Sequence, residues 1–261
     1  MKGNYNKGRF IETKVVNQLD GSKIKDLDKD SRSLLRSIYG QLEDEEMVRC
    51  ELVSGYKKPD FYIEYKGVRK YVSLKSGGSK TVHEEELDTF CDFLLSLGAK
   101  ERDVQTLRFL FWGDGTFDGT GERYFSAASA ADMFPELVKE FNKSINGDKR
   151  IVNEVIRRAL FDGRKTDGIT ADYIYHFSED YLQFAVAKQV MWNYVQSKDW
   201  DYRDTPHIGP LSFAPNSTNK NNAQYQFYRK RISFWWPHLS SDLKFINEHY
   251  VFWPKRKPSI S

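Results

Sequence analysis

The chain has 261 residues, enough for one large domain or two small ones with a hydrophobic core. Apolar residues make up 39% of the sequence and charged residues 30%, with a net charge of only +3, which excludes an intrinsically disordered chain. No apolar run approaches the ~18 residues that span a bilayer, and the first ten residues lack the apolar centre of a secretory signal. Cys50 and Cys91 have no metal-binding spacing. We therefore expect a globular protein of the reducing cytoplasm, with no membrane anchor, zinc site or disulfide.

The first 75 residues predict helices followed by three strands. Apolar residues recur at helical spacing over residues 8–19 and again after Ser31. Strands are predicted over residues 47–54, 60–65 and 68–75. Lys66-Gly67 separates the last two strands and is a hairpin signal, so we expect them to pair in antiparallel fashion.

The next segment predicts a helix and a further strand. Thr81 as N-cap and Glu84 three residues later form a capping box, which favours a helix from Thr81 to Gly98. The short apolar run Leu107 to Trp112 predicts a strand. The expected order is helix, three strands, helix, strand, an α/β arrangement.

Beyond Gly121 the pattern is weaker. Helices are expected over residues 127–145 and 149–160, strands over 169–177 and 225–236, and a long loop over 204–222, with 186–196 ambiguous. We expect a core over residues 1–120 and a mixed C-terminal region of helices and strands over 121–261.

Positive charge gathers toward the C-terminal end. Residues 220–257 hold eight lysine and arginine residues against two acids, whereas the rest of the chain holds more acids than bases. Such a segment is expected to meet an anionic polymer, the alternative being a solvated basic face. Arg229, Lys230 and Arg231 stand among aromatic residues, so we expect them to contact nucleic acid.

The most informative motif is Pro59-Asp60 followed by Ser73-Leu74-Lys75. On a hairpin, Asp60 begins one strand and Lys75 ends its antiparallel partner, so both reach the same end of the sheet. Ser73 and Lys75 are two residues apart and share a face. A carboxylate, a lysine and further acids at a sheet end suit metal-assisted phosphodiester cleavage, in which oxygen ligands hold Mg²⁺.

Glu12 adds a second carboxylate. It lies in the middle of the apolar face of the first helix, between Val15, Val16 and Leu19. An unpaired buried charge costs several kcal/mol, so Glu12 needs a partner. A salt bridge to a lysine is the alternative to the metal-linked site that we favour.

This element order, with Glu12, Pro59-Asp60 and Ser73-Leu74-Lys75, resembles the PD-(D/E)xK nuclease superfamily of restriction enzymes and repair nucleases over about residues 8–113. The resemblance implies a restriction-endonuclease-like core and Mg²⁺ as cofactor. It also implies catalytic roles for Glu12, Asp60, Ser73 and Lys75, with Asp60 as a metal ligand. The sequence departs from the family at Ser73, where an acid is expected.

Some restriction endonucleases of this superfamily have serine at that position and recruit a glutamate from the following helix. Here the expected helix opens with Glu84, Glu85 and Glu86. Glu84 is assigned to the capping box, so Glu85 and Glu86 are the alternatives for the second metal ligand. For each of them, a favourable charge against the helix dipole is the other interpretation.

These expectations combine into a Mg²⁺-dependent endonuclease acting on double-stranded DNA. By family analogy it is a type II restriction enzyme or a related defence nuclease, with a homodimer among the assemblies allowed. The alternative is a catalytically inactive nucleic-acid-binding protein on a nuclease-like fold. Retention of Glu12, Asp60 and Lys75 together favours activity.

Overall fold

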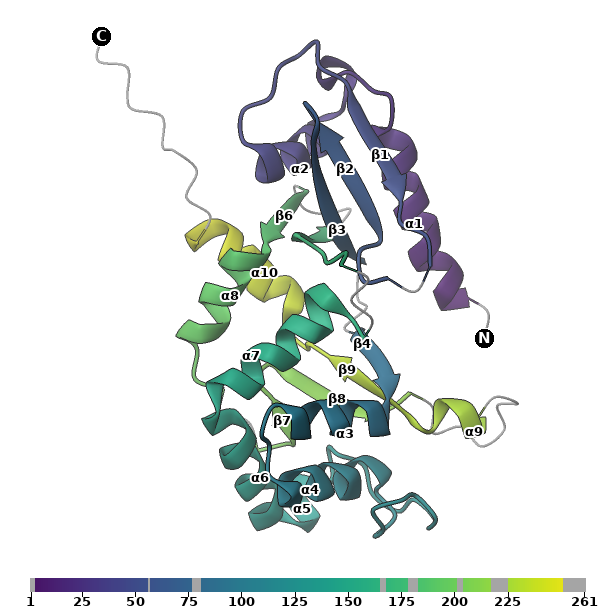
Figure 1. The fold of residues 1–261 in the computed structure, drawn as a ribbon, viewed down its shortest axis with the longest axis vertical. Helices are drawn as coiled ribbons and strands as arrows, with labels where there is room; N and C mark the ends of the chain where they lie inside the picture. Colours follow the sequence, from purple (N-terminus) through teal and green to yellow (C-terminus); the bar gives the residue numbers. More distant parts are fainter. Residues whose placement is uncertain are drawn as a thin grey trace. The chain divides into compact units, whose positions relative to one another are not determined.

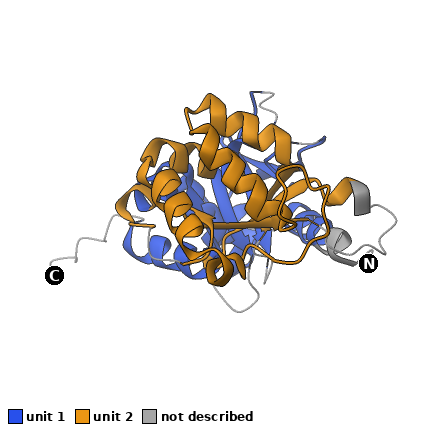
Figure 2. Ribbon diagram, turned by 90° about the horizontal axis from the view of Figure 1, so that it is seen from below, with its two compact units in different colours: residues 1–79, 160–194, 239–261 blue, residues 80–159, 195–238 orange. Residues whose placement is uncertain are grey.

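The structure is a computed structural model, in which the described residues are 3–55, 57–76, 81–164, 168–177, 183–200, 204–216 and 225–250. The chain forms two compact units, which Figure 2 colours separately. Unit 1 comprises residues 1–79, 160–194 and 239–261, and unit 2 comprises residues 80–159 and 195–238. Each unit combines residues from both sides of position 120, where the sequence analysis placed a boundary. The division into a core over residues 1–120 and a C-terminal region over 121–261 stays a prediction.

Unit 1 contains a five-stranded mixed sheet in the order β1-β2-β3-β5-β6. Its strands are β1 (Val48–Leu52), β2 (Phe61–Tyr65), β3 (Val68–Ser76), β5 (Tyr173–Phe177) and β6 (Phe184–Ala187). β3 pairs with β2 in antiparallel fashion and with β5 in parallel fashion. The four strands expected up to residue 177, apart from the one at 107–112, are thus confirmed. Lys66 (φ 51°) and Gly67 (φ 74°) form the left-handed pair that a two-residue hairpin turn requires.

Helices cover this sheet. Unit 1 includes α1 (Gly3–Leu19), the short η1 (Ile24–Asp26), α2 (Lys29–Tyr39), α10 (Leu239–His249) and most of α8 (Lys188–Ser197). α1 and α2 bury their apolar residues against one sheet face, so that Leu19 and Leu35 pack in the same core as Ile63 and Leu74 (Figure 1). Each such buried aliphatic side chain is worth about 1.5–3 kcal/mol.

Unit 2 contains a four-stranded antiparallel sheet in the order β4-β9-β8-β7. Its strands are β4 (Thr81–Glu86), β7 (His207–Ile208), β8 (Leu211–Pro215) and β9 (Arg231–Trp235). Its helices are α3 (Leu87–Ser96), α4 (Glu101–Trp112), α5 (Ala130–Met133), α6 (Pro135–Gly147), α7 (Lys149–Arg157) and α9 (Tyr225–Tyr228). A π-helical segment, η2 (Arg158–Asp162), follows α7 and leads from unit 2 into unit 1.

Two expected elements of the core order are wrong. The helix expected from Thr81 to Gly98 is strand β4 followed by α3, because residues 81–86 pair with β9 and the capping box does not form. The strand expected over Leu107 to Trp112 is the second half of α4. Its buried Val104, Leu107 and Phe111 are spaced for one helix face, and a short apolar run does not distinguish a buried helix from a strand.

The C-terminal expectations are confirmed in part. The helix expected over 149–160 is α7, whereas 127–145 divides into α5 and α6. The ambiguous 186–196 contains the end of β6 and most of α8. The long loop expected over 204–222 contains β7 and β8, and the strand expected over 225–236 begins only at Arg231, after the short α9.

A buried ion pair joins β4 to the end of the helical segment in unit 2. The Glu85 side chain is 0% exposed, and its two carboxylate oxygens accept hydrogen bonds from Arg158 at 2.8 and 2.5 Å. His83 lies 3.0 Å from the same carboxylate, and the Arg158 guanidinium lies 4.3 Å from the centre of the Phe93 ring. Burial opposes ionisation of Glu85, but the hydrogen bonds from Arg158 and His83 outweigh it and lower its pKa.

Among the helices of the described residues, none is both long and apolar enough to cross a bilayer.

We predict that Arg158→Met destabilises the protein by about 3–5 kcal/mol, because it leaves the buried Glu85 carboxylate without its bidentate partner. Urea unfolding at neutral pH measures this loss. The control is Arg102→Met, which removes an ion pair with Glu140 whose side chains are 72% and 58% exposed. That change should cost under about 1 kcal/mol. Equal losses in the two variants would contradict a structural role for the buried pair.

Candidate active site

Asp60 is held rigidly at one end of the unit 1 sheet. It directly precedes β2, where its N–H donates to the Val72 carbonyl (2.9 Å) and its carbonyl accepts from the Val53 N–H (3.0 Å). Its carboxylate oxygen Oδ2 accepts a hydrogen bond from the Leu74 N–H at 2.6 Å. The carboxylate is therefore oriented by β3, the strand that carries Lys75.

Ser73 and Lys75 share one face of β3. Leu74, between them, packs in the core beneath α1 and α2, so strand alternation sends its two neighbours to the opposite face. In the parallel pair with β5, Ser73 is opposite Ile174 and Lys75 is opposite His176. Ser73 is 0% exposed, and its hydroxyl has no hydrogen-bond partner among the described residues.

Glu12 reaches the same end of the sheet from α1. In Figure 1 the first half of α1, the start of β2 and the end of β3 all lie at that end. Burial raises the pKa of the Glu12 carboxyl, and the negative charge of Asp60 raises it further, whereas Arg9 and Lys75 lower it. Asp60 and Lys75 therefore lie close enough to Glu12 to affect its pKa, and we refer to the three residues as one electrostatic cluster.

Arg9 is a member of this cluster that the sequence analysis missed. Its guanidinium lies 3.9 Å from the Glu12 carboxylate, one helical turn away. The i,i+3 spacing of the two residues on a helix is a signal that was available in the sequence. Glu12 thus has an arginine partner on its own helix, in addition to the electrostatic effect of Lys75 on β3.

Glu85 and Glu86 lie in unit 2 on strand β4, and Glu86, the last residue of that strand, is also the N-cap residue of α3, without a capping hydrogen bond from its side chain. Glu85 is bound by Arg158 and His83, and Glu86 forms an ion pair with Arg231 at 3.4 Å. Glu84 accepts a hydrogen bond from the Asn216 amide at 2.7 Å. The role of Glu85 or Glu86 as a metal ligand stays a prediction.

The three expected DNA-binding residues differ in their surroundings. Arg229 is half-buried, donates a hydrogen bond to the Gly119 carbonyl and lies 5.2 Å from the centre of the Trp112 ring. Arg231 begins β9 and pairs with Glu86, while Lys230 is exposed in the turn between α9 and β9. The strand expected over 225–236 would have included all three residues, but only Arg231 belongs to a strand.

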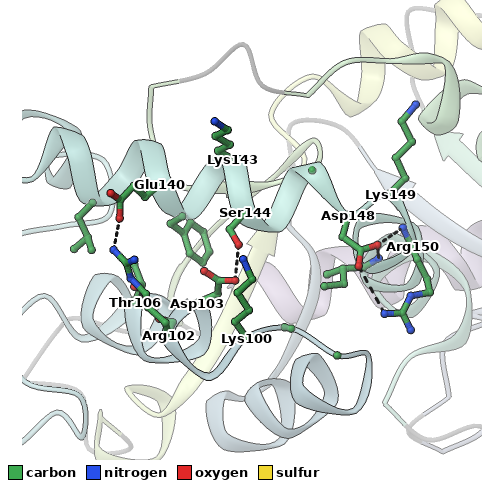
Figure 3. A pocket seen from close by; sticks show the side chains of 16 residues that line it. Lys100, Arg102, Asp103, Thr106, Glu140, Lys143, Ser144, Asp148, Lys149 and Arg150 are labelled. Carbon is green, nitrogen blue, oxygen red and sulfur yellow. Dashed lines mark hydrogen bonds and ion pairs between the residues drawn. The ribbon is translucent and has the colours of Figure 1, made fainter.

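A hollow of about 950 Å³ lies in unit 2 between α4, α6 and the start of α7 (Figure 3). Each of its three carboxylates has a partner: Glu140 pairs with Arg102, Asp103 accepts from Ser144, and Asp148 accepts from the Arg150 N–H. Because these carboxylates are engaged, the hollow does not resemble a site for Mg²⁺.

In the described part of unit 1, the carboxylates of Glu12 and Asp60 lie near each other and near Lys75. Across the described residues, no group of three or more histidine, cysteine, aspartate or glutamate side chains is placed to hold a metal ion. Mg²⁺ is usually bound through one or two carboxylates and keeps several waters, so two carboxylates beside a buried hydroxyl without a partner fit this ion.

The sequence matches no protein-family model and no curated protein. Among solved structures, the fold is similar to that of restriction endonuclease MspI, which was determined in complex with its cognate DNA. The TM-score is 0.55, the sequence identity is 13%, and the match covers 87% of each chain. This likeness shows that the chain has a fold of the restriction-endonuclease kind.

We predict that Glu12→Gln stabilises the protein at neutral pH. Because the pKa of Glu12 is raised on folding, ionisation of this residue opposes folding. The contribution of the Glu12 carboxyl to the free energy of unfolding is greatest below the ordinary glutamate pKa of about 4.3. It falls as the pH rises through the higher pKa of the folded state. Urea unfolding at pH 7 and at pH 4 measures the difference, which should be present at the first pH and vanish at the second. Asp44→Asn, at an exposed position, is the control and should change stability at neither pH.

Proposed function

We propose that the protein is a metal-dependent DNA endonuclease that hydrolyses phosphodiester bonds. The observation that carries the proposal is the cluster of Glu12, Asp60 and Lys75 at one end of a sheet whose fold is shared with a restriction endonuclease. Fold likeness by itself does not determine chemistry, so the argument depends on these three side chains. A restriction or related defence role is the biological setting that we infer.

Glu12 and Asp60 are the residues that would hold Mg²⁺. When bound, the ion supplies charge stabilisation to the phosphodiester and lowers the pKa of a coordinated water. The Leu74 N–H fixes the orientation of the Asp60 carboxylate, so little entropy is lost when this ligand binds. The buried Ser73 hydroxyl is left to hydrogen bond to water or substrate at the site.

Lys75 has two roles in this proposal. Its positive charge lowers the pKa of Glu12, against the larger effects of burial and of Asp60, which raise it. Its ammonium also donates hydrogen bonds that orient the attacking water and balance the negative charge that develops on the phosphate. Because residue 73 is a serine and not an acid, Lys75 is the only charged side chain among residues 71–76 of β3.

Double-stranded DNA is the proposed partner, and cognate DNA bound to MspI supports this choice. We expect Lys230 and Arg231 to supply phosphate contacts and Arg229 to support them through its bond to Gly119. The proposal includes the cytoplasm as the location and a homodimer as an assembly able to cut both strands.

A second candidate is a DNA-binding protein without catalytic activity. It is favoured by the serine at position 73 and by the ion pairs that occupy Glu85 and Glu86. Incubation with mixed-sequence DNA in Mg²⁺ and in EDTA distinguishes the two candidates, because only the first predicts cleavage that the chelator abolishes.

We predict that Asp60→Ala or Lys75→Ala abolishes cleavage and leaves DNA binding in EDTA in place. Loss of several kcal/mol of transition-state stabilisation lowers the cleavage rate by a factor of about 10³ or more. Cleavage rates under single-turnover conditions provide the measurement. Glu64→Ala and Lys70→Ala alter the same two strands toward their other ends and should cut at the parental rate. Parental cleavage by either site variant would show that this active site is wrong.

We predict that Lys230→Ala and Arg231→Ala each reduce the slope of log affinity against log salt by roughly 0.9 on duplex DNA, as expected for one lost phosphate contact. Arg229→Ala should in addition lower the melting temperature, since this side chain is bonded within unit 2. Titrations in EDTA at several salt concentrations measure the slopes. Lys139→Ala, an exposed cation of α6, is the control. Slopes equal to that of the parent in all variants would argue against this surface.

A further inference from the structure

The turn after η2 packs directly against the loop that leads into Asp60. Gly163 has a φ of 70°, and a Cβ added there would lie 3.3 Å from the Cβ of Lys58 and 3.9 Å from its Cα. Lys58 is followed by the buried Pro59 and then by Asp60. Two segments about 100 residues apart in the sequence thus meet in unit 1, beside the proposed metal ligand.

This contact places two cations on the adjoining segments: Lys57 lies three residues before Asp60, and Arg164 directly follows Gly163. Lys57 is half-buried and Arg164 is exposed, and neither forms an ion pair or side-chain hydrogen bond within the described part of the chain. Asp162, two residues before Arg164 in the sequence, is itself 5% exposed and pairs with Lys188 at 3.0 Å. Since Lys188 neutralises Asp162, the charges of Lys57 and Arg164 are not offset there.

The carboxylates of the site do not account for these two cations. Glu12 interacts with Arg9 and Lys75, and the Asp60 carboxylate accepts a hydrogen bond from the Leu74 N–H. A lysine and an arginine that have no partner among the described residues, beside the proposed nuclease site, are suited to charge-assisted hydrogen bonds with phosphate oxygens. Along one DNA strand the phosphates follow each other at about 3.4 Å of axial rise, so those next to the cleaved bond come near the loop that carries Asp60.

We propose that Lys57 and Arg164 bind the DNA backbone phosphates adjacent to the phosphodiester that is cleaved. The inference rests on the proposed nuclease function and adds to it a subsite that holds the strand in register over Glu12 and Asp60. Contacts of this kind carry no base information, so the subsite acts on every DNA sequence alike.

The test measures binding of the full chain to a mixed-sequence DNA duplex in EDTA, over a series of salt concentrations. Lys57→Ala and Arg164→Ala should each reduce the slope of log affinity against log salt by about 0.9, and the double variant by about twice as much. Lys57→Arg and Arg164→Lys keep the charge and should restore most of the slope. Arg49→Ala, which removes an exposed cation of β1 in the same unit, should bind like the parent.

Two outcomes would overturn the subsite: parental affinity and slope in the double variant, or an equal loss in Arg49→Ala. Neither outcome would contradict the nuclease proposal, which is tested by the cleavage assays of the Asp60→Ala and Lys75→Ala variants. Conversely, a protein that does not cleave DNA but loses slope only in the Lys57 and Arg164 variants would retain the phosphate subsite and lose the proposed chemistry. Melting temperatures of all variants identify any loss that comes from misfolding.

Discussion

The parallel pairing of β3 with β5 is the constraint on which the rest of unit 1 depends. The Asp172 side chain accepts a hydrogen bond from the Tyr71 N–H, 101 residues earlier in the chain, and the strands then run side by side from Val72 to Ser76. β3 thereby gains a neighbour on both edges. With β2 on its other side, this strand fixes both the Leu74 amide that orients Asp60 and the position of Lys75.

The same strand explains which parts of the fold were predictable. The hairpin from Phe61 to Ser76 depends on neighbouring residues and on a Lys66-Gly67 turn, and its signals are all local. The segment 81–86 carries a local helix-start signal, yet it pairs with Arg231 to Trp235, nearly 150 residues later. Tertiary pairing overrode local preference at this position, and no pattern in residues 81–98 contains that information.

The site divides in a similar way. Asp60 and Lys75 were predictable because a short hairpin determines their separation, and Glu12 because a carboxylate on an apolar helix face needs an explanation. The surroundings of Glu85 and Arg229 were not predictable. Their partners, Arg158 and Gly119, come from distant segments, and a charged side chain in a sequence does not reveal whether it faces solvent or a buried counter-ion.

The placement of the whole of 80–159 between β3 and β5 has a consequence for how the protein is made. During synthesis β3 leaves the ribosome long before the residues of β5 exist, and until then one edge of β3 lacks its final partner. An unpaired edge strand is a template for wrong pairing, and closing a loop of this length slows folding. The nascent chain therefore passes through a stage in which the hairpin bearing Asp60 and Lys75 can form but the sheet around it cannot yet be complete.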